Sequence, residues 1–358
     1  MPVFKWIFDM ARSLRASLSP NGARGEVSAA GAPSNAKLQQ AQQKIARQQE
    51  QIRRQRQELE ELRAKLAETV HGTEHPGIRP ENVIWILGTG RSGSTWLAFM
   101  MERLKNYTVW REPYVGQLFG QFYDSWVGKK HFETKHFILG QRYRESWLRS
   151  IRNFVLNEAT VRFPAVSDEG YLVVKEPNGS IGAPLLLEAL PESRMIFLIR
   201  DPRDVMASSL DAYRKGSWLY ERRVEQGGGR TAMFDMPENA LMESTTNAYL
   251  RSIVNVKEAY ETHGGPKVLV RYEDLRSDTL ATMRRIYSSL GVPVEERKLS
   301  EAVEKHSWDN VPEEKKGPGK FHRKGTPGSW REDLRPEQIE IVERIAAPLL
   351  EEYYPDER

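Results

Sequence analysis

The sequence predicts an α/β fold: a P-loop-like central parallel sheet flanked by helices, preceded by an N-terminal coiled-coil helix. From Val83 onward, short apolar runs alternate with helical stretches, as is typical of a parallel sheet covered on both faces. The first apolar run ends in a glycine-rich loop that nearly fits a phosphate-binding frame. A heptad repeat precedes this globular part.

Composition and charge place few limits on function. The chain has 358 residues, with 53 Lys and Arg against 49 Asp and Glu, for a formal net charge of +4. This mildly basic balance suits an anionic small molecule and gives no reason to expect nucleic acid as a partner. The absence of cysteine excludes disulfides, Cys-ligated zinc and cysteine nucleophiles.

Residues 1–18 are predicted to form an amphipathic helix. Three interpretations are open: a helix at a membrane interface, a transit peptide rich in Arg and Ser, or a helix that docks on a partner. A Pro/Gly-rich segment at 19–36 follows and predicts a flexible linker. The apolar side of the predicted helix consists of Val3, Phe4, Ile7, Met10, Leu14 and Leu18.

Residues 37–70 contain no Gly or Pro, and apolar side chains recur there every seven residues. This pattern predicts a coiled coil that makes the protein a homo-oligomer, either a dimer or a trimer. A long solvated helix docked on its own domain is the alternative. A second linker at 71–82 leads into one domain at 83–358. The apolar seam is Leu38, Ile45, Ile52, Leu59 and Leu66, and the second seam is Ala41, Gln48, Gln55, Leu62 and Thr69.

Five apolar runs in the domain predict the strands of the sheet, and helical stretches separate them. The runs lie at 83–88, 107–111, 171–175, 195–200 and 267–272, and the main helical stretches at 94–105, 182–190, 203–213, 239–262 and 278–290. Polar residues follow each strand. Because parallel strands bring their carboxyl ends to one edge, where ligands bind, we expect these residues to form a site. They include Glu112, Lys175, Glu176, Arg200 and Tyr272.

The loop after the first strand, GTGRSGST, predicts a phosphate site. Gly90 and Gly93 allow a tight turn that presents N–H groups, and the following helix adds its positive end. Arg91 supplies a fork of donors suited to a tetrahedral oxyanion. A nucleoside triphosphatase would have lysine where this chain has Ser94. A turn that serves packing alone is the alternative. The hydroxyl donors of the loop are Ser92, Ser94 and Thr95.

Three segments resemble motifs of sulfotransferases that use 3′-phosphoadenosine 5′-phosphosulfate (PAPS). GTGRSGSTWL, at 88–97, resembles their 5′-phosphosulfate loop, with Arg91 where those enzymes carry Lys or Arg. IRDPRDVMASSL, at 199–210, resembles their 3′-phosphate motif, an Arg followed eight residues later by a Ser. HRKGTPGSWRED, at 322–333, resembles their R-K-G-x-x-G-x-W element. Three motifs in the family's order make the resemblance specific.

The resemblance implies PAPS as co-substrate, no metal, and transfer of the sulfuryl group to an acceptor hydroxyl. It implies that Arg200 and Ser208 hold the 3′-phosphate and that Arg323 closes over it, while Trp96 and Tyr272 contact the adenosine or belong to the core. The implied nucleotide-binding residues are Gly90, Arg91, Ser92, Gly93, Ser94, Thr95, Trp96, Arg200, Ser208, Tyr272, Arg323, Lys324 and Gly325.

Glu112 is the predicted general base, because WREPY resembles the arrangement of carbohydrate- and protein-modifying members, which use a glutamate after the second strand. Lys175 and Arg91 are predicted to stabilise the leaving and transferring groups. Phenol and steroid sulfotransferases place a histidine two residues after that lysine, where this chain has Pro177. A carbohydrate-like acceptor is therefore expected. Glu176 is the second candidate for the base, and a structural ion pair is the alternative role for Glu112.

Two other functions compete with this interpretation. A nucleotide kinase or NTPase with a degenerate P-loop would depend on magnesium. A coiled-coil scaffold with an inactive nucleotide fold would bind the nucleotide product poorly. The sequence favours a cytoplasmic enzyme, which would be membrane-associated if residues 1–18 bind lipid. Aromatic-rich segments at 116–163 and 214–236 follow strand ends, where an acceptor would enter.

A chain that begins at Arg79 is predicted to be monomeric, whereas the full chain is predicted to be a dimer or trimer. The reason is that the whole heptad seam precedes that residue. Light scattering coupled to gel filtration measures both masses. The same oligomeric state for both chains would show that the heptad segment does not drive assembly.

Overall fold

The computed structural model describes residues 43, 46–58, 77–129, 134–166, 170–225 and 232–357. The chain divides into two compact units, Met1–Thr73 and Glu74–Arg358. In the first unit, residues 46–58 are helical and their side chains are exposed. The predicted helix at 1–18, both linkers up to residue 76 and most of the 37–70 heptad segment lie outside the described residues, so the coiled coil stays a prediction. No helix in the described part of the chain is long and apolar enough to cross a membrane.

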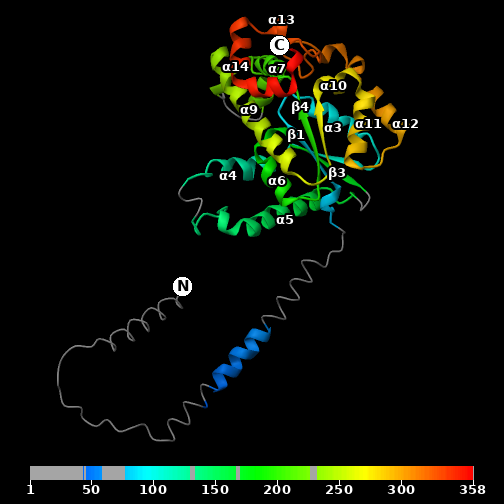
Figure 1. Cartoon of the computed structure of the whole chain (residues 1–358). Helices are drawn as coiled ribbons and strands as arrows, with labels where there is room; N and C mark the ends of the chain where they lie inside the picture. Colours follow the sequence, from blue (N-terminus) through cyan, green and yellow to red (C-terminus); the bar gives the residue numbers. More distant parts are fainter. Residues whose placement is uncertain are drawn as a thin grey trace, which may run out of the picture. The chain divides into compact units, whose positions relative to one another are not determined.

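A sheet of five parallel strands forms the centre of the second unit (Figure 1). Its order is β2-β3-β1-β4-β5, so β1 lies in the middle, and the loop that follows it leaves from the centre of the sheet. Lys175 pairs in register with Arg111 on one side and Ile86 on the other. The strands are β1 (Val83–Gly88), β2 (Tyr107–Arg111), β3 (Tyr171–Lys175), β4 (Arg194–Ile199) and β5 (Lys267–Arg271).

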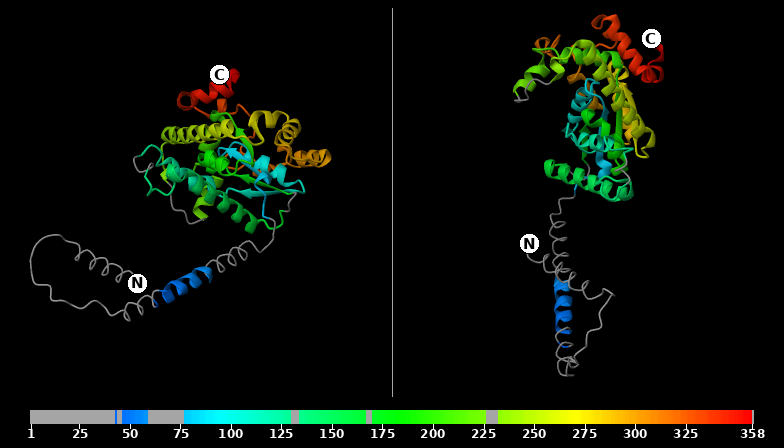
Figure 2. Two further views of the ribbon diagram at one scale, coloured as in Figure 1. Left: turned by 60° about the horizontal axis from the view of Figure 1, so that its bottom comes forward. Right: turned by 90° about the vertical axis from the view of Figure 1, so that its left-hand side faces the viewer.

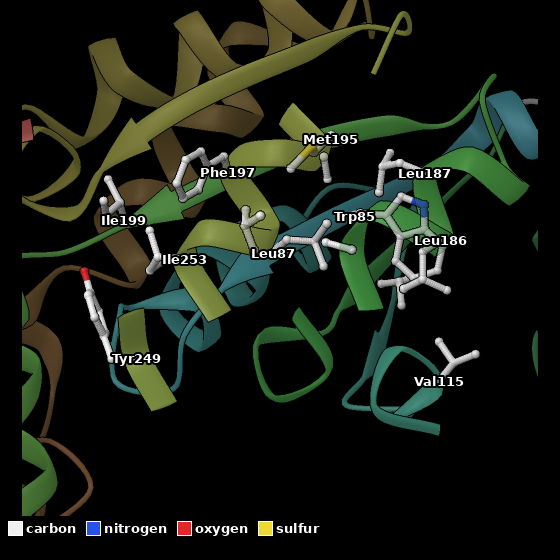
Figure 3. Packing of buried hydrophobic residues seen from close by; sticks show 14 of the residues in the cluster. Trp85, Leu87, Val115, Leu186, Leu187, Met195, Phe197, Ile199, Tyr249 and Ile253 are labelled. Carbon is white, nitrogen blue, oxygen red and sulfur yellow. The ribbon is translucent and has the colours of Figure 1, made fainter. Parts of the chain in front are cut away.

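Helices cover both faces of the sheet (Figure 2). Alternate residues of β1 enter different cores: Trp85 and Leu87 pack on one side, and Ile84 and Ile86 on the other. The first core, part of which Figure 3 shows, includes side chains of α5 (Arg144–Arg162), α6 (Ala183–Ala189), α7 (Pro202–Ala212), α9 (Glu238–Thr262) and α14 (Pro336–Tyr353). The second includes α3 (Ser94–Glu102), α10 (Tyr272–Ser277), α11 (Thr279–Leu290) and α12 (Glu296–Lys305).

Shorter elements connect these layers and complete the edge where the strands end. The short α-helices are α4 (Phe122–Asp124), α8 (Trp218–Glu225) and α13 (Trp330–Asp333). The other short turns are the π-helical η2 (Gln117–Gln121) and the 3-10 turns η1 (Pro80–Asn82), η4 (Gln141–Tyr143), η5 (Pro177–Gly182), η6 (Ala232–Phe234), η7 (Trp308–Asn310), η8 (Glu313–Lys315) and η9 (Pro355–Glu357).

Local sequence signals account for several helix ends. The Asp201 carboxylate accepts the Arg203 N–H at 2.8 Å and caps α7, whose first residue is Pro202. Asp278 caps α11, which ends at Gly291 with φ of 62°. The predicted α/β class with a parallel sheet is confirmed, and the five predicted strands and five main helices are present with small shifts at their ends. Helices α5, α12 and α14 were not predicted.

Candidate active site

The glycine-rich loop turns tightly because glycines let other backbone approach it. A Cβ on Gly88 would lie 2.1 Å from the Leu198 carbonyl oxygen, and one on Gly93 would lie 2.6 Å from the Tyr272 ring. Gly93, at φ 92°, directly precedes α3, so the N–H groups of the first helical turn face the loop. The Ser92 hydroxyl donates to the Thr89 carbonyl at 2.7 Å and thereby braces the turn from inside.

The three segments that carry the sequence motifs converge on this loop. Arg200 donates to the Arg91 carbonyl at 3.0 Å, and Arg91 Nε donates to the Ser208 hydroxyl at 2.9 Å. The Tyr272 hydroxyl donates to the Gly325 carbonyl at 3.1 Å. The Arg200 guanidinium lies 4.3 Å from the centre of the Tyr272 ring. Tyr272 therefore contacts all three motif segments: its ring lies against Gly93 and Arg200, and its hydroxyl bonds to Gly325.

Cationic side chains concentrate where these segments meet. Burial, followed by the nearby guanidinium groups of Arg200 and Arg323, lowers the pKa of Arg91 to about 10. Arg200 is buried, and its Nε atom has no hydrogen-bond partner among the described residues. A cluster of like charges with a free buried donor is stabilised by a bound polyanion, so these residues fit a nucleotide with more than one phosphate.

Aromatic rings enclose Arg91 on the side away from the sheet. Its guanidinium lies 5.4 Å from the Trp218 ring and 5.1 Å from the Phe321 ring, and it donates to the Phe321 carbonyl at 2.9 Å. Trp96 Nε1 donates to the His306 carbonyl at 2.7 Å, and its ring meets the Tyr272 ring edge-on. Cation–π contacts of this kind hold an arginine in place while leaving it charged.

Carboxylates of α13 engage the two cations of the late motif. Arg323 forms an ion pair with Asp333 and donates to the Ser329 hydroxyl at 3.2 Å. Lys324 contacts Asp333 at 2.8 Å and Glu332 at 3.2 Å, and the hydrogen bond to Asp333 raises the pKa of Lys324. The structure thus brings Arg323 beside Arg91, whereas the ammonium group of Lys324 contacts the α13 carboxylates.

A second cluster lies beside the loop, at the ends of β2 and β3. The buried Lys175 forms an ion pair with Glu112, and its Nζ atom also lies 3.4 Å from the Thr95 hydroxyl. The Tyr114 hydroxyl donates to Glu112 at 3.4 Å. Among the described residues, positive φ at a non-glycine residue occurs at Arg91 (67°), Glu112 (50°) and Tyr114 (59°). Such strained backbone concentrates at functional sites, and all three residues belong to this region.

Glu176, the second candidate for the base, holds a loop in place. One carboxylate oxygen accepts the Tyr114 N–H at 3.0 Å and the other accepts the Gly116 N–H at 3.2 Å, at the start of the helical segment that contains η2. Its side chain is buried, and burial raises the pKa of Glu176 to about 7 despite these bonds. Ionising Glu176 therefore costs folding free energy, and its contribution to stability is lost as the pH rises through about 7.

A family profile described as "Sulfotransferase family" matches residues 83–296. The chain belongs to the sulfotransferase family. The matched region contains the loop, Arg200 and Ser208, Glu112 and Lys175, and Tyr272, while the Arg323 segment follows it.

Sequence identity to individual sulfotransferases is low and extends over part of the chain. The chain is 28% identical over 156 residues to Stf3 of Mycobacterium bovis, an omega-hydroxy-beta-dihydromenaquinone-9 sulfotransferase. The aligned region covers 42% of this chain and 35% of Stf3. The chain is 24% identical over 169 residues to sulfotransferase 2A6 of Rattus norvegicus, covering 43% and 55%. The chain thus spans less than two thirds of either relative. The solved structure of sulfotransferase STF9 from Mycobacterium avium shares the fold, with a TM-score of 0.50, 15% identity and coverage of 82% and 81%.

Asp204 is a residue of the candidate site that the sequence motifs did not single out. Its buried carboxylate accepts the Gly328 N–H at 2.7 Å and the Trp330 N–H at 3.0 Å, and lies 3.9 Å from Arg200. It thereby ties the late motif to α7, which carries Ser208. A signal was available, because Asp204 follows Arg200 by one helical turn within the quoted 3′-phosphate motif. Trp218 and Phe321 had no comparable signal, since only the tertiary fold brings them to Arg91.

Asp204→Asn is predicted to lower the affinity for 3′-phosphoadenosine 5′-phosphate (PAP) about 10- to 100-fold and the stability by about 1–3 kcal/mol, because an amide cannot accept all of these donors. Calorimetric titration with PAP and thermal unfolding measure the two effects. Asp278→Ala is the control, because it removes a helix-capping side chain outside the site and should reduce stability only. Wild-type PAP affinity in Asp204→Asn would contradict the anchoring role.

Proposed function

We propose that this sulfotransferase transfers the sulfuryl group of PAPS to an acceptor hydroxyl, with Glu112 as general base. The observation that carries the proposal is the arrangement of two anion-binding groups next to a lysine–carboxylate pair. The loop with Arg91 forms one group, and Arg200 with Ser208 forms the other. The two groups meet where Arg91 donates to Ser208 and accepts from Arg200. A 3′,5′-bisphosphate nucleotide needs two such groups, whereas a triphosphate chain does not.

The described residues fit the nucleotide from both ends. The N–H groups at the start of α3 and the Arg91 guanidinium would hold the 5′-phosphosulfate. The free Nε of Arg200, the Ser208 hydroxyl and Arg323 would hold the 3′-phosphate. The 3′-phosphate and the sulfuryl group belong to the same PAPS molecule. Binding of the 3′-phosphate would therefore also position the sulfuryl group for transfer.

The chemistry asks the protein to place the acceptor, remove its proton and stabilise the departing phosphate. The acceptor oxygen forms the new bond to sulfur as the bond between sulfur and the 5′-phosphate oxygen breaks, which yields a sulfate ester and PAP. A Glu112 carboxylate oxygen takes the acceptor proton. Lys175, which contacts both Glu112 and Thr95, and Arg91 stabilise charge on the transferring and leaving groups.

The acceptor, the assembly and the membrane contact remain proposals. A carbohydrate-like acceptor rests on the position of Glu112 after β2. The name of Stf3 denotes a hydroxylated menaquinone as its acceptor, so a test panel should include that class of compound as well as glycans, phenols and tyrosine peptides. Homo-oligomerisation through residues 37–70 and lipid contact through residues 1–18 are supported by sequence pattern. The exposed helix at 46–58 is compatible with the first of these.

The direct test is release of PAP from PAPS with this acceptor panel, measured in EDTA. No group of His, Asp or Glu residues that could hold a metal ion occurs in the part of the chain that the structure describes. Sulfuryl transfer from PAPS is expected to proceed in EDTA, while a kinase or NTPase would lose activity. Arg91→Ala should reduce turnover at least about 100-fold. Arg103→Ala, an exposed arginine at the end of α3, is the control. Near-wild-type turnover in Arg91→Ala would contradict the loop assignment.

Glu112→Gln is predicted to lower kcat by about 10²–10⁴-fold while leaving PAP affinity within about threefold of wild type, because the amide cannot take the acceptor proton. The dependence of kcat on pH at the acidic side should disappear with the carboxylate. Glu176→Gln provides the comparison: it should lower the melting temperature and keep the acidic limb of the pH profile. An acidic limb that survives in Glu112→Gln and vanishes in Glu176→Gln would reassign the base to Glu176.

A further inference from the structure

The segment that follows Glu112 exposes an unusual set of apolar side chains. Ile138 is 75% exposed, Leu118 57% and Phe122 46%, and Val127 is also exposed. Phe122 contacts Trp126 and Phe137, and these two rings contact each other. We call this set the apolar face; it consists of Tyr114, Leu118, Phe122, Trp126, Val127, Phe137 and Ile138.

The backbone fixes the direction of this face. Gly116 and Gly120 form the inner side of the helical segment that contains η2 and α4, and a Cβ on either would collide with the backbone of Gly179 or Gly182 in η5. Between these two glycines, Leu118 points away from the domain, whereas Phe119 packs against Phe154 of α5. In Figure 1, α4 lies at the edge of the domain, and its Tyr123 ring contacts Trp147 of α5.

Three cations belong to the same part of the chain as the apolar face. Lys129 lies 4.9 Å from the Trp126 ring, Arg142 lies 5.7 Å from the Tyr143 ring, and Lys135 is exposed. Asp124 is the single carboxylate in the described stretches 115–129 and 134–143. Exposed aromatic and aliphatic side chains interleaved with Lys and Arg match the composition of protein surfaces at anionic membranes. A second copy of the chain would bring like charges together at this face, which disfavours self-association there.

We propose that the apolar face docks on an anionic lipid surface. Phe122, Trp126 and Ile138 would enter the boundary between headgroups and acyl chains, and Lys129 and Arg142 would contact lipid phosphates. The face begins at Tyr114, whose hydroxyl contacts Glu112, so a docked lipid surface would lie next to the proposed base. The proposal concerns binding alone, requires no nucleotide and is independent of the lipid contact proposed for residues 1–18.

A single-site probe tests this docking in the full chain. The protein has no cysteine, so Ile138→Cys and Val254→Cys each provide one labelling position for an environment-sensitive fluorophore such as NBD. Val254 is 49% exposed and lies on α9, outside the apolar face, which makes it the matched control. With vesicles of phosphatidylglycerol and phosphatidylcholine, emission at position 138 should shift to the blue and rise severalfold, while emission at position 254 should stay unchanged. Vesicles of phosphatidylcholine alone should give a weaker response.

Paired substitutions supply a second readout. Leu118→Ser with Ile138→Ser should lower partitioning onto the anionic vesicles by about tenfold or more, because burial of even one such side chain corresponds to at least a tenfold change. Val161→Ser with Val254→Ser removes similarly exposed apolar side chains elsewhere and should have no effect. An unchanged probe at position 138, equal responses at 138 and 254, or unaltered partitioning of the first variant would overturn the proposal. Vesicle binding carried by residues 1–18 alone would give the first of these results.

Discussion

The ion pair between the buried Lys175 and the partly buried Glu112 is the interaction on which the candidate site depends. Lys175 ends β3 between its two neighbouring strands, and a buried ammonium group is costly unless a carboxylate accompanies it. Glu112 reaches it from the end of β2 with a left-handed backbone conformation, and the Glu112 N–H donates to the Lys175 carbonyl at 2.8 Å. β3 is also paired with β1, so a one-residue shift of the edge strand β2 would turn the side chains of β2 to the other face and separate Glu112 from Lys175.

At the nucleotide end of the site, repulsion among arginines opposes their attraction to neighbouring carboxylates. Arg91, Arg200 and Arg323 repel one another, and the repulsion from Arg200 and Arg323 adds to the effect of burial in lowering the pKa of Arg91. Asp204 and Asp333 offset part of it from the far side of these cations. Phosphate groups of the nucleotide would offset the rest. The same cluster therefore lowers the stability of the unliganded fold. It also favours binding of a ligand with two separated anions, and such a loss of stability is common at functional sites.

Much of the fold follows from short-range patterns, and the rest depends on contacts between distant segments. The apolar strands and the phosphate loop could be predicted because each is a local pattern. The strand order and the helix α14 could not be predicted from such patterns. The contacts of Trp218 and Phe321 with Arg91 could not be predicted either, because only the folded chain brings these residues together. The proposal of Glu112 rather than Glu176 as the base also draws on the structure. Both follow strands, but the oxygens of Glu176 accept backbone N–H groups, whereas Glu112 faces Lys175 and Tyr114.

The central claim is that the fold holds two separated phosphates of one nucleotide. Calorimetric titration of the full chain in EDTA with PAP and with adenosine 5′-monophosphate tests it most directly, because the two ligands differ only in the 3′-phosphate. A charged group held by Arg200, Ser208 and Arg323 is expected to strengthen binding of PAP by about 100-fold or more. Equal affinities for the two nucleotides, or binding that requires magnesium, would contradict the account.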